Sequence, residues 1–300
     1  MVKRLAPLFL LFLFSCANNR RLNNTQYETP PGAIGISDNL YFDESEVSNL
    51  GYLEYLWWTA RVYGLKSNEY FSAFPDTTVW IKLDKVYSSF ALLYLRHPTY
   101  REYPVVGINY TQALKFTEWR ANRVMEFIAI REGLIRHIPS PHKDSVFTIE
   151  KFFNCEYKTR QPNFLEYYPE YSLPDSITYL KAIKFADTFN KKNFKPGSKK
   201  WCGQNPIQVN CYESIKFKND TLPYGPNPIT LSYCRKNHKS VIAHLKGNVR
   251  EITANPKFTF GGSFKDSCKS ELFLLNDSVN AYTGFRNVCR WKKWTGIKKP

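Results

Sequence analysis

The sequence lacks several features that mark common classes of enzyme. It contains no G-x-x-x-x-G-K loop to hold a nucleotide phosphate, and no internal repeat of about 20 to 50 residues is visible. None of its 7 cysteines is spaced C-x-x-C, and its 5 histidines form neither an H-x-x-x-H nor an H-E-x-x-H pattern. Nucleotide chemistry, a repeat architecture and a zinc or non-haem iron centre are therefore poorly supported.

Methionine is also scarce, with 2 residues, whereas the chain contains 20 Tyr, 22 Phe and 7 Trp. This is the composition of a rigid aromatic core with many phenol and indole donors to satisfy, and such cores favour irregular, loop-rich folds. The 300 residues, 43% of them hydrophobic, are enough for one large domain or two small ones. The 42 Lys and Arg residues exceed the 26 Asp and Glu residues, so an anionic partner is expected.

The first residues have the pattern of a bacterial lipoprotein signal. Lys3 and Arg4 precede an apolar run over 5–14, which is too short to span a bilayer. Cys16 follows Leu-Phe-Ser directly, which resembles the lipobox whose cysteine is lipidated and becomes the new N-terminus. We therefore expect a lipoprotein signal peptide over 1–15 and a lipid on Cys16, which would attach the protein to a membrane.

The residues after the lipidation cysteine indicate the destination. Position 17 holds Ala rather than the Asp associated with inner-membrane retention, and Asn-Asn-Arg-Arg follows instead of the acidic run that some lineages use for surface export. The sequence therefore predicts an outer-membrane lipoprotein that faces the periplasm, with surface exposure left open. Lipid phosphates and peptidoglycan carboxylates are the nearer anions there, so the positive charge does not predict nucleic-acid binding.

Composition divides the mature chain into three parts. Residues 16–31, rich in Asn and Arg and ending in Pro-Pro, predict a tether, whereas 32–290 looks globular and 291–300 reads as a basic tail. Apart from Cys16 there are six cysteines, an even number that suits disulfide bonds in an oxidising compartment.

Three segments carry helix signals. Ser48 can cap a helix that Gly64 ends, and Asn109 with Gln112 forms a capping-box pattern that opens a helix over 110–133. A third helix is expected from Pro174-Asp175 to about Phe189. Spacing of three and four residues predicts that these helices face the core through Leu50, Leu53, Trp57 and Ala60, through Ala113, Phe116 and Trp119, and through Tyr179, Ala182, Ala186 and Phe189.

The rest of the chain reads as short strands and loops punctuated by 18 Pro and 14 Gly. Helices around a modest antiparallel sheet fit this pattern better than a bundle or a doubly wound fold. The expected fold class is α+β with little regular secondary structure.

Six short sequence blocks occur in an order that resembles a known family. They are D-E-S-E-V-S-N at 43–49, P-V-V-G-I-N-Y-T-Q-A with F-T-E-W-R between 104 and 120, Y-S-L-P-D at 171–175, G-N-V-R-E at 247–251, G-G-S-F-K-D at 261–266 and T-G-F-R at 283–286. Together they resemble the signature blocks of the formylglycine-generating enzyme, or sulfatase-modifying factor, family. The resemblance runs from about residue 36 to 288 and implies that family's variant of the C-type lectin fold.

The chain departs from the catalytic members at their copper-binding cysteine pair. Those members place both thiols just after the G-G-S-F block, because copper(I) needs soft thiolate ligands. Here the two positions hold Asp266 and Glu271, and Cys268 is offset from both. Cys268 and Cys289, which flank the final strands, are instead expected to form a disulfide with each other, and no catalytic residue is assigned.

The resemblance also implies roles for residues of the G-N-V-R-E and T-G-F-R blocks. Glu251 and Arg286 are expected to form a buried structural pair. Some family members bind calcium near the G-N-V-x-E loop, so Asn248 and Glu251 are the candidate ligands if Ca²⁺ is bound, and no other cofactor is expected.

An insertion over about 136–172 is longer than compact family members need. It interleaves aromatic residues with cations, a composition typical of interface hot spots, and Arg160, Tyr167 and Tyr168 are the partner-binding candidates. The alternative is that its aromatic residues fill an enlarged core.

These features leave three hypotheses for the function. The favoured one is a non-catalytic structural or interaction lipoprotein in a cell-envelope complex, as in the gliding-motility and secretion branch of the resembled family. The alternative is a lectin-like binder of anionic glycan or peptidoglycan, using the tail residues Trp291, Lys292, Lys293 and Trp294, which could equally form a frayed terminus. The least favoured hypothesis is an oxidase that uses Cys268.

Overall fold

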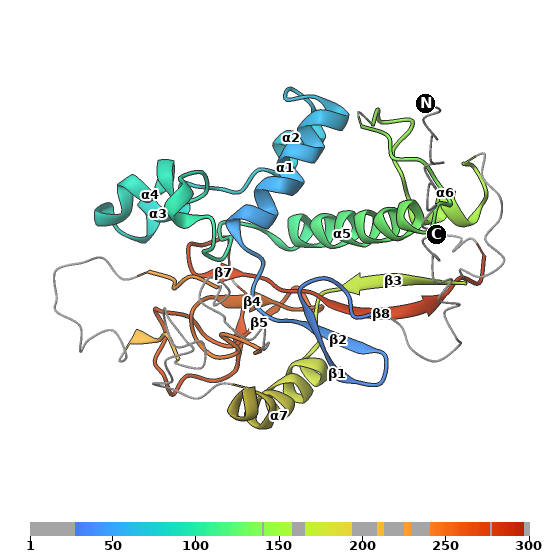
Figure 1. Cartoon of the computed structure of the whole chain (residues 1–300). Helices are drawn as coiled ribbons and strands as arrows, with labels where there is room; N and C mark the ends of the chain where they lie inside the picture. The colour runs from blue at the N-terminus through green and yellow to red at the C-terminus, as the bar shows by residue number, and fades with distance from the viewer. Residues whose placement is uncertain are drawn as a thin grey trace, which may run out of the picture.

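The computed structural model describes residues 28–139, 141–157, 166–193, 209–212, 225–229, 241–276 and 278–296. Its fold class is α+β, with two four-stranded sheets (Figure 1). The strands of the first sheet, in spatial order, are β1 (Ala33–Ser37), β2 (Leu40–Asp43), β8 (Val288–Lys293) and β3 (Tyr167–Ser172). Those of the second are β6 (Phe273–Leu275), β5 (Phe258–Phe260), β4 (Arg250–Ile252) and β7 (Thr283–Gly284).

The helices differ widely in length. The described elements are α1 (Asn49–Tyr63), α2 (Asn68–Ala73), α3 (Val79–Leu83), α4 (Ser88–Leu93), α5 (Tyr110–Arg131), α6 (Ile149–Phe153) and α7 (Ser176–Asn193), with 3₁₀ turns at Lys85–Tyr87 and Pro98–Tyr100. No helix in the described ranges is long and apolar enough to cross a membrane.

The first sheet lies between two of the long helices, α5 on one face and α7 on the other (Figure 1). Successive residues of the central strand β8 point to opposite faces of the sheet. Val288 packs in the cluster with Tyr179 of α7, and Cys289 packs in the cluster with Met125 of α5. All pairings in this sheet are antiparallel, as the sequence predicts for its main sheet.

The predicted helix starts are confirmed, because each depends on a local hydrogen bond. The Ser48 hydroxyl accepts from the backbone N–H of Gly51 at the start of α1. Asn109 and Gln112 form the reciprocal capping box of α5. Asp175 accepts from the N–H of Thr178 at the start of α7, which continues to residue 193 rather than ending near 189.

The predicted core face of α1 is correct only in part, because Leu53 packs against the core whereas Leu50 and Trp57 do not. Trp57 is 59% exposed and Leu50 is exposed, whereas Tyr52, Tyr55 and Leu56 are buried. The phenol of Tyr52 can enter the core because its hydroxyl donates to the backbone oxygen of Ala73. The buried face of α1 is therefore rotated toward Tyr52, Tyr55 and Leu56, away from Leu50 and Trp57.

The basic tail expected from residue 291 is also corrected. Strand β8 continues to Lys293, between β2 and β3, and Trp291 is only 8% exposed. Trp294, just after the strand, stacks on Phe153 of α6. Lys293 forms an ion pair with Glu166. The stacking surface proposed for a lectin-like tail is thus largely used for packing within the fold.

The second sheet brings the blocks near the C-terminal end together. Strands β4 and β7 pair in parallel, with Glu251 opposite Gly284, so the G-N-V-R-E and T-G-F-R blocks lie side by side. The turn before β4 has Gly247 at φ +76°, and a Cβ there would overlap the backbone oxygen of Asn210. Only glycine allows this close approach.

Candidate functional site

A buried polar cluster is centred on Arg286. Its side chain is fully buried, and its Nε lies 2.8 and 2.7 Å from the two carboxylate oxygens of Glu251. The guanidinium also donates to the backbone oxygens of Asp43 and Ala243. The pair expected from the sequence is therefore present, and it ties β4 to the end of β2 and to the segment at 241–244.

A second carboxylate, Glu46, lies near the same guanidinium. One of its oxygens accepts from the amide nitrogen of Asn248 at 2.9 Å, and the other is 3.8 Å from Arg286 Nη2. Burial raises the pKa of both acids, that of Glu251 to about 7, even though Arg286 lowers both. Two carboxylates thus share one buried cation, an arrangement that favours retention of a proton near neutral pH.

Asn248 and Glu251 do not fit a calcium site. The side-chain oxygen of Asn248 accepts hydrogen bonds from Asn210 and from the backbone N–H of Asn227. Both Glu251 oxygens face Arg286, and one also accepts from the hydroxyl of Tyr179. A calcium ion would have to displace these donors and lie beside a guanidinium. Within the described residues no group of three or more His, Cys, Asp or Glu is placed to hold a metal ion.

His244 is a further titratable side chain of this cluster. It is 5% exposed and has a left-handed backbone, with φ of 53°. Burial, aided by the charge of Arg286, lowers the pKa of His244 to about 4. The imidazole is therefore neutral at physiological pH and adds no positive charge to the cluster.

Asp266, which stands where catalytic members of the resembled family have their first copper-binding cysteine, forms an ion pair with Arg250. Asp266 accepts from the Nε and Nη2 of Arg250, at 2.8 and 2.5 Å, and from the hydroxyl of Ser263 at 2.7 Å. Burial opposes ionisation of Asp266, but these hydrogen bonds outweigh it and lower its pKa. Glu271, at the second cysteine position, is exposed.

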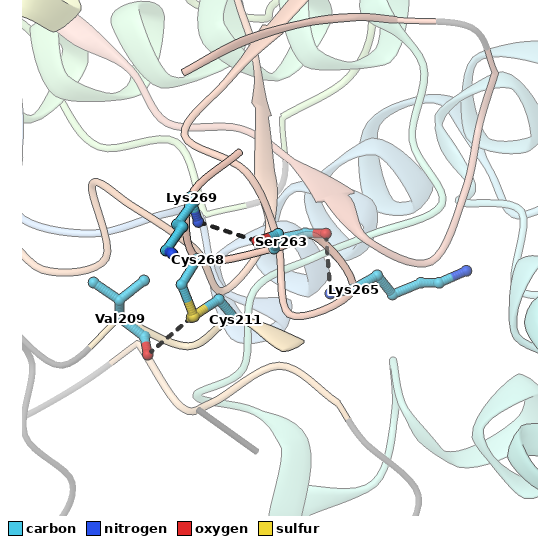
Figure 2. Close-up of a disulfide and its surroundings, with 7 residues drawn as sticks. Val209, Cys211, Ser263, Lys265, Cys268 and Lys269 are labelled. Carbon is cyan, nitrogen blue, oxygen red and sulfur yellow. Dashed lines mark hydrogen bonds between the residues drawn. A yellow bond between two sulfur atoms is a disulfide. The ribbon is translucent and has the colours of Figure 1, made fainter. Parts of the chain in front are cut away.

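Cys268 forms a disulfide with Cys211, which corrects the expected pairing with Cys289 (Figure 2). The Cα atoms of Cys211 and Cys268 are 5.1 Å apart, and a backbone hydrogen bond from Tyr212 to Asp266 holds the two segments together. Cys289 is instead a buried free thiol in β8, in the layer that contacts α5. Cys268 and Cys289 both lie near the final strands in sequence, but the fold does not bring them together.

The insertion contributes both core and surface. Phe147 and Phe152 are buried against α5, so this part supports the alternative in which the insertion enlarges the core. Tyr167 and Tyr168 are half-buried on the edge strand β3, and the Tyr168 ring contacts Phe153. Arg160, the third candidate, lies outside the described residues, as does Cys16.

A cavity of about 350 Å³ lies between α1, α5 and the loop that precedes α1. Residues of the D-E-S-E-V-S-N and F-T-E-W-R blocks border it, among them Asp43, Glu46, Trp119 and Arg120. Sequence reasoning gave these residues no role in a site, because their blocks served only to identify the resemblance. Their spacing in sequence gives no signal that they share a cavity.

Comparison with known proteins adds little to this description. No family model and no curated protein matches the sequence. Two solved structures are similar over most of the chain. A crystal structure of CarF has 15% identity, covers 84% of this chain and 86% of its own, and has a TM-score of 0.39. Variable protein 1 of Treponema denticola has 14% identity, 84% coverage of both chains and a TM-score of 0.35. These values are too low to assign a family or a function.

Proposed function

We propose that this protein is a non-catalytic interaction lipoprotein, held by a lipid on Cys16 at the periplasmic face of the outer membrane and working in an envelope complex. Its scaffold would be a variant of the fold of the formylglycine-generating enzyme family. The observation that supports the non-catalytic role most directly is the disulfide between Cys268 and Cys211. Because Cys268 is oxidised in this bond, the cysteine nearest to the copper-binding positions of the resembled family has no free thiol to bind copper.

The two aligned positions argue in the same direction. Asp266 is held by Arg250 and Ser263, and a carboxylate in that arrangement is a hard ligand already used by protein donors. Reduction of the disulfide would free a thiol on Cys268 and one on Cys211, but the two positions that hold the thiolate pair in catalytic members would still carry the Arg250–Asp266 ion pair and the exposed Glu271. The residues present therefore favour a binding role over oxidation of a cysteine substrate.

The edge of the first sheet is the proposed partner-binding surface. Tyr167 and Tyr168 lie on β3, whose outer edge is not paired with another described strand, and exposed Lys292 and Lys293 lie opposite them on β8. Tyrosine is enriched in protein interfaces, and the two lysines, which are ion-paired with Glu170 and Glu166, would belong to the charged rim of this surface. An envelope protein would bind along the outer edge of β3 by contacting Tyr167 and Tyr168.

The test is recovery of partners from native envelope with the lipidated chain. The complete protein, tagged at its C-terminus, should recover one envelope complex reproducibly, and Cys16→Ser should lose it by releasing the protein from the membrane. Arg160→Ala with Tyr167→Ala should reduce recovery severalfold, whereas Phe71→Ala, an exposed aromatic residue of α2, should not. Unchanged recovery with the double variant contradicts the proposed surface.

A separate assay tests the non-catalytic role. The purified protein, supplied with copper(I) and oxygen, should not convert a sulfatase-type cysteine peptide. Turnover that is lost in Cys268→Ser would contradict the proposal and support the oxidase alternative.

A further inference from the structure

The outer side of α7 carries a stripe of exposed residues that is apolar at its start and cationic beyond it. Its members follow one another at steps of four and three positions, the spacing that places side chains on one side of a helix. They are Ile177, Lys181, Lys184, Thr188 and Lys191, all of them exposed. The opposite side of α7, with Tyr179, Ala182 and Ala186, packs into the core. The stripe therefore faces away from the fold.

Further exposed apolar side chains lie beside the start of this stripe. Leu180 is 50% exposed and follows Ser176 by one helical turn, so both lie on the same side of α7. Ser176 borders a hollow of about 510 Å³ together with Phe258 of β5, which is also exposed. Leu275 of β6 is 69% exposed and pairs with Phe258, so these two side chains share one face of the second sheet. With Ile177, they form an apolar surface at the start of α7.

The charge around this apolar surface is mainly positive. Besides the lysines of the stripe, the exposed Lys257 directly precedes Phe258. The nearby acids lie off the stripe: Asp175 caps the start of α7, and Asp187 borders a separate hollow on another side of the helix. Glu271 lies beyond the end of β6 that is remote from Phe258. An anionic partner is therefore favoured over a cationic one.

Exposed apolar side chains flanked by lysines match the surface of an anionic bilayer. A small anion would pair with the lysines but would leave the apolar side chains in water. Anionic phospholipids satisfy both, because their phosphates pair with lysines while apolar side chains enter the boundary between headgroups and acyl chains. The position of the proposed lipid agrees with this partner. Cys16 and Glu28 are twelve positions apart, a reach of at most about 40 Å, and β1, which starts shortly after Glu28, packs against α7.

We propose that the outer side of α7, with Phe258 and Leu275 of the paired strands β5 and β6, docks on an anionic phospholipid surface. This second membrane contact rests on the membrane location in the proposed function, but it uses none of the residues of the proposed partner-binding surface. Because α7 covers a face of the first sheet and β3 forms one edge of that sheet, docking through α7 leaves the β3 edge accessible to a protein partner (Figure 1).

The experiment measures contact of single residues with the bilayer, using the complete lipidated protein in vesicles with brominated acyl chains. Vesicles of two parts phosphatidylcholine and one part phosphatidylglycerol are compared with phosphatidylcholine alone. Leu180→Trp and Leu275→Trp each add an indole, and the anionic vesicles should quench about half of the added emission, the phosphatidylcholine vesicles less. Leu92→Trp is the matched control, since Leu92 is 80% exposed on α4, apart from α7 (Figure 1), and its added emission should not be quenched. No more quenching of the first two variants than of the control overturns the proposal.

Charge reversal then tests the lysines. Lys181→Glu with Lys184→Glu should abolish the added quenching of Leu180→Trp, whereas Lys66→Glu with Lys143→Glu, at exposed loop positions away from α7, changes the net charge equally and should leave it unchanged. Quenching that persists in the first pair contradicts docking through α7.

The lipid anchor is judged separately in the same samples. If the anchor alone fails, the natural chain should leave the phosphatidylcholine vesicles but stay on the anionic ones, which supports the α7 contact. If the α7 contact alone fails, the protein should stay on both kinds of vesicle without the added quenching. Loss from both kinds of vesicle contradicts both contacts.

Discussion

Arg286 and Glu251 face each other in a region closed to solvent, with Arg286 Nε 2.7 Å from Glu251 Oε2. Glu251 lies on β4, and Arg286 follows β7, the strand that pairs with β4 in parallel. Because the Arg286 guanidinium also donates to the backbone oxygen of Asp43 at the end of β2, the pair links the two sheets. The two residues stabilise the fold only together, because either one alone would be a buried charge without a counter-charge.

Breaking this pair should destabilise the protein strongly. Glu251→Gln and Arg286→Met should each lower the free energy of unfolding by about 3 to 5 kcal/mol, and the double variant should lose less than the sum. Urea denaturation measures all three. Lys82→Ala, which breaks the exposed Lys82–Asp76 pair, should cost less than about 1 kcal/mol. Additive losses in the double variant would contradict a coupled pair.

His244 should make the stability depend on pH. Its pKa is about 4 in the folded protein against an ordinary value of 6.5, so the unfolded chain binds a proton first as the pH falls. The neutral imidazole therefore contributes fully to the free energy of unfolding above pH 6.5. This free energy decreases by up to about 3 kcal/mol as the pH falls toward 4. The nearby acids Glu46 and Glu251, whose pKa values are raised, act in the opposite direction.

Because of these opposing effects, the measurement is a difference between proteins. His244→Asn, which tolerates the left-handed backbone, should show a smaller loss of thermal stability between pH 6.5 and 4 than the natural chain. The exposed His142→Asn should follow the natural chain. Parallel curves for His244→Asn and the natural chain would show that the imidazole does not titrate in this way.

The disulfide assignment is tested by chemistry. Non-reducing digestion should yield a peptide pair containing Cys211 and Cys268, and Cys289 should react with iodoacetamide only after denaturation. The bond closes a sequence separation of 57 residues, which is worth about 4 kcal/mol in the chain-entropy model. Cys268→Ala should lower the melting temperature accordingly. Recovery of a Cys268–Cys289 peptide would refute the pairing.

Truncation tests the structural role of the C-terminal segment. Ending the chain after Gly296 should leave thermal unfolding nearly unchanged, since Trp291 and Trp294 remain. Ending it after Arg290 removes half of β8, with the buried Trp291 and the Phe153–Trp294 stack, and should abolish cooperative unfolding. Circular dichroism distinguishes the two outcomes, and similar melting of both truncated chains would support a frayed tail.

The features that sequence predicted well are local. The helix starts at Ser48 and at Asn109 were predictable because a cap depends on residues three positions apart. The core face of α1 was predictable only in part, since Tyr52 enters the core through a partner elsewhere in the chain, the backbone oxygen of Ala73. Apolar spacing alone cannot show which aromatic hydroxyls will find such partners.

Only the part of the site that lies within recognisable sequence blocks was predictable. The Glu251–Arg286 contact followed from blocks whose order is recognisable, but the Cys211–Cys268 pairing and the cavity depend on segments brought together by the fold. The cavity walls range from Gly32 to Ile229, and no periodicity links positions so far apart.

The central position of β8 has a consequence for how the chain folds. Its neighbour β2 lies near the start of the domain, and the Asn39 side chain bonds to Trp291 across 252 residues of sequence. A ribosome releases the N-terminal hairpin long before its partner strand exists, so the sheet cannot close during synthesis. Such a high contact order predicts slow folding and an extended period in which hydrophobic edges remain available to chaperones.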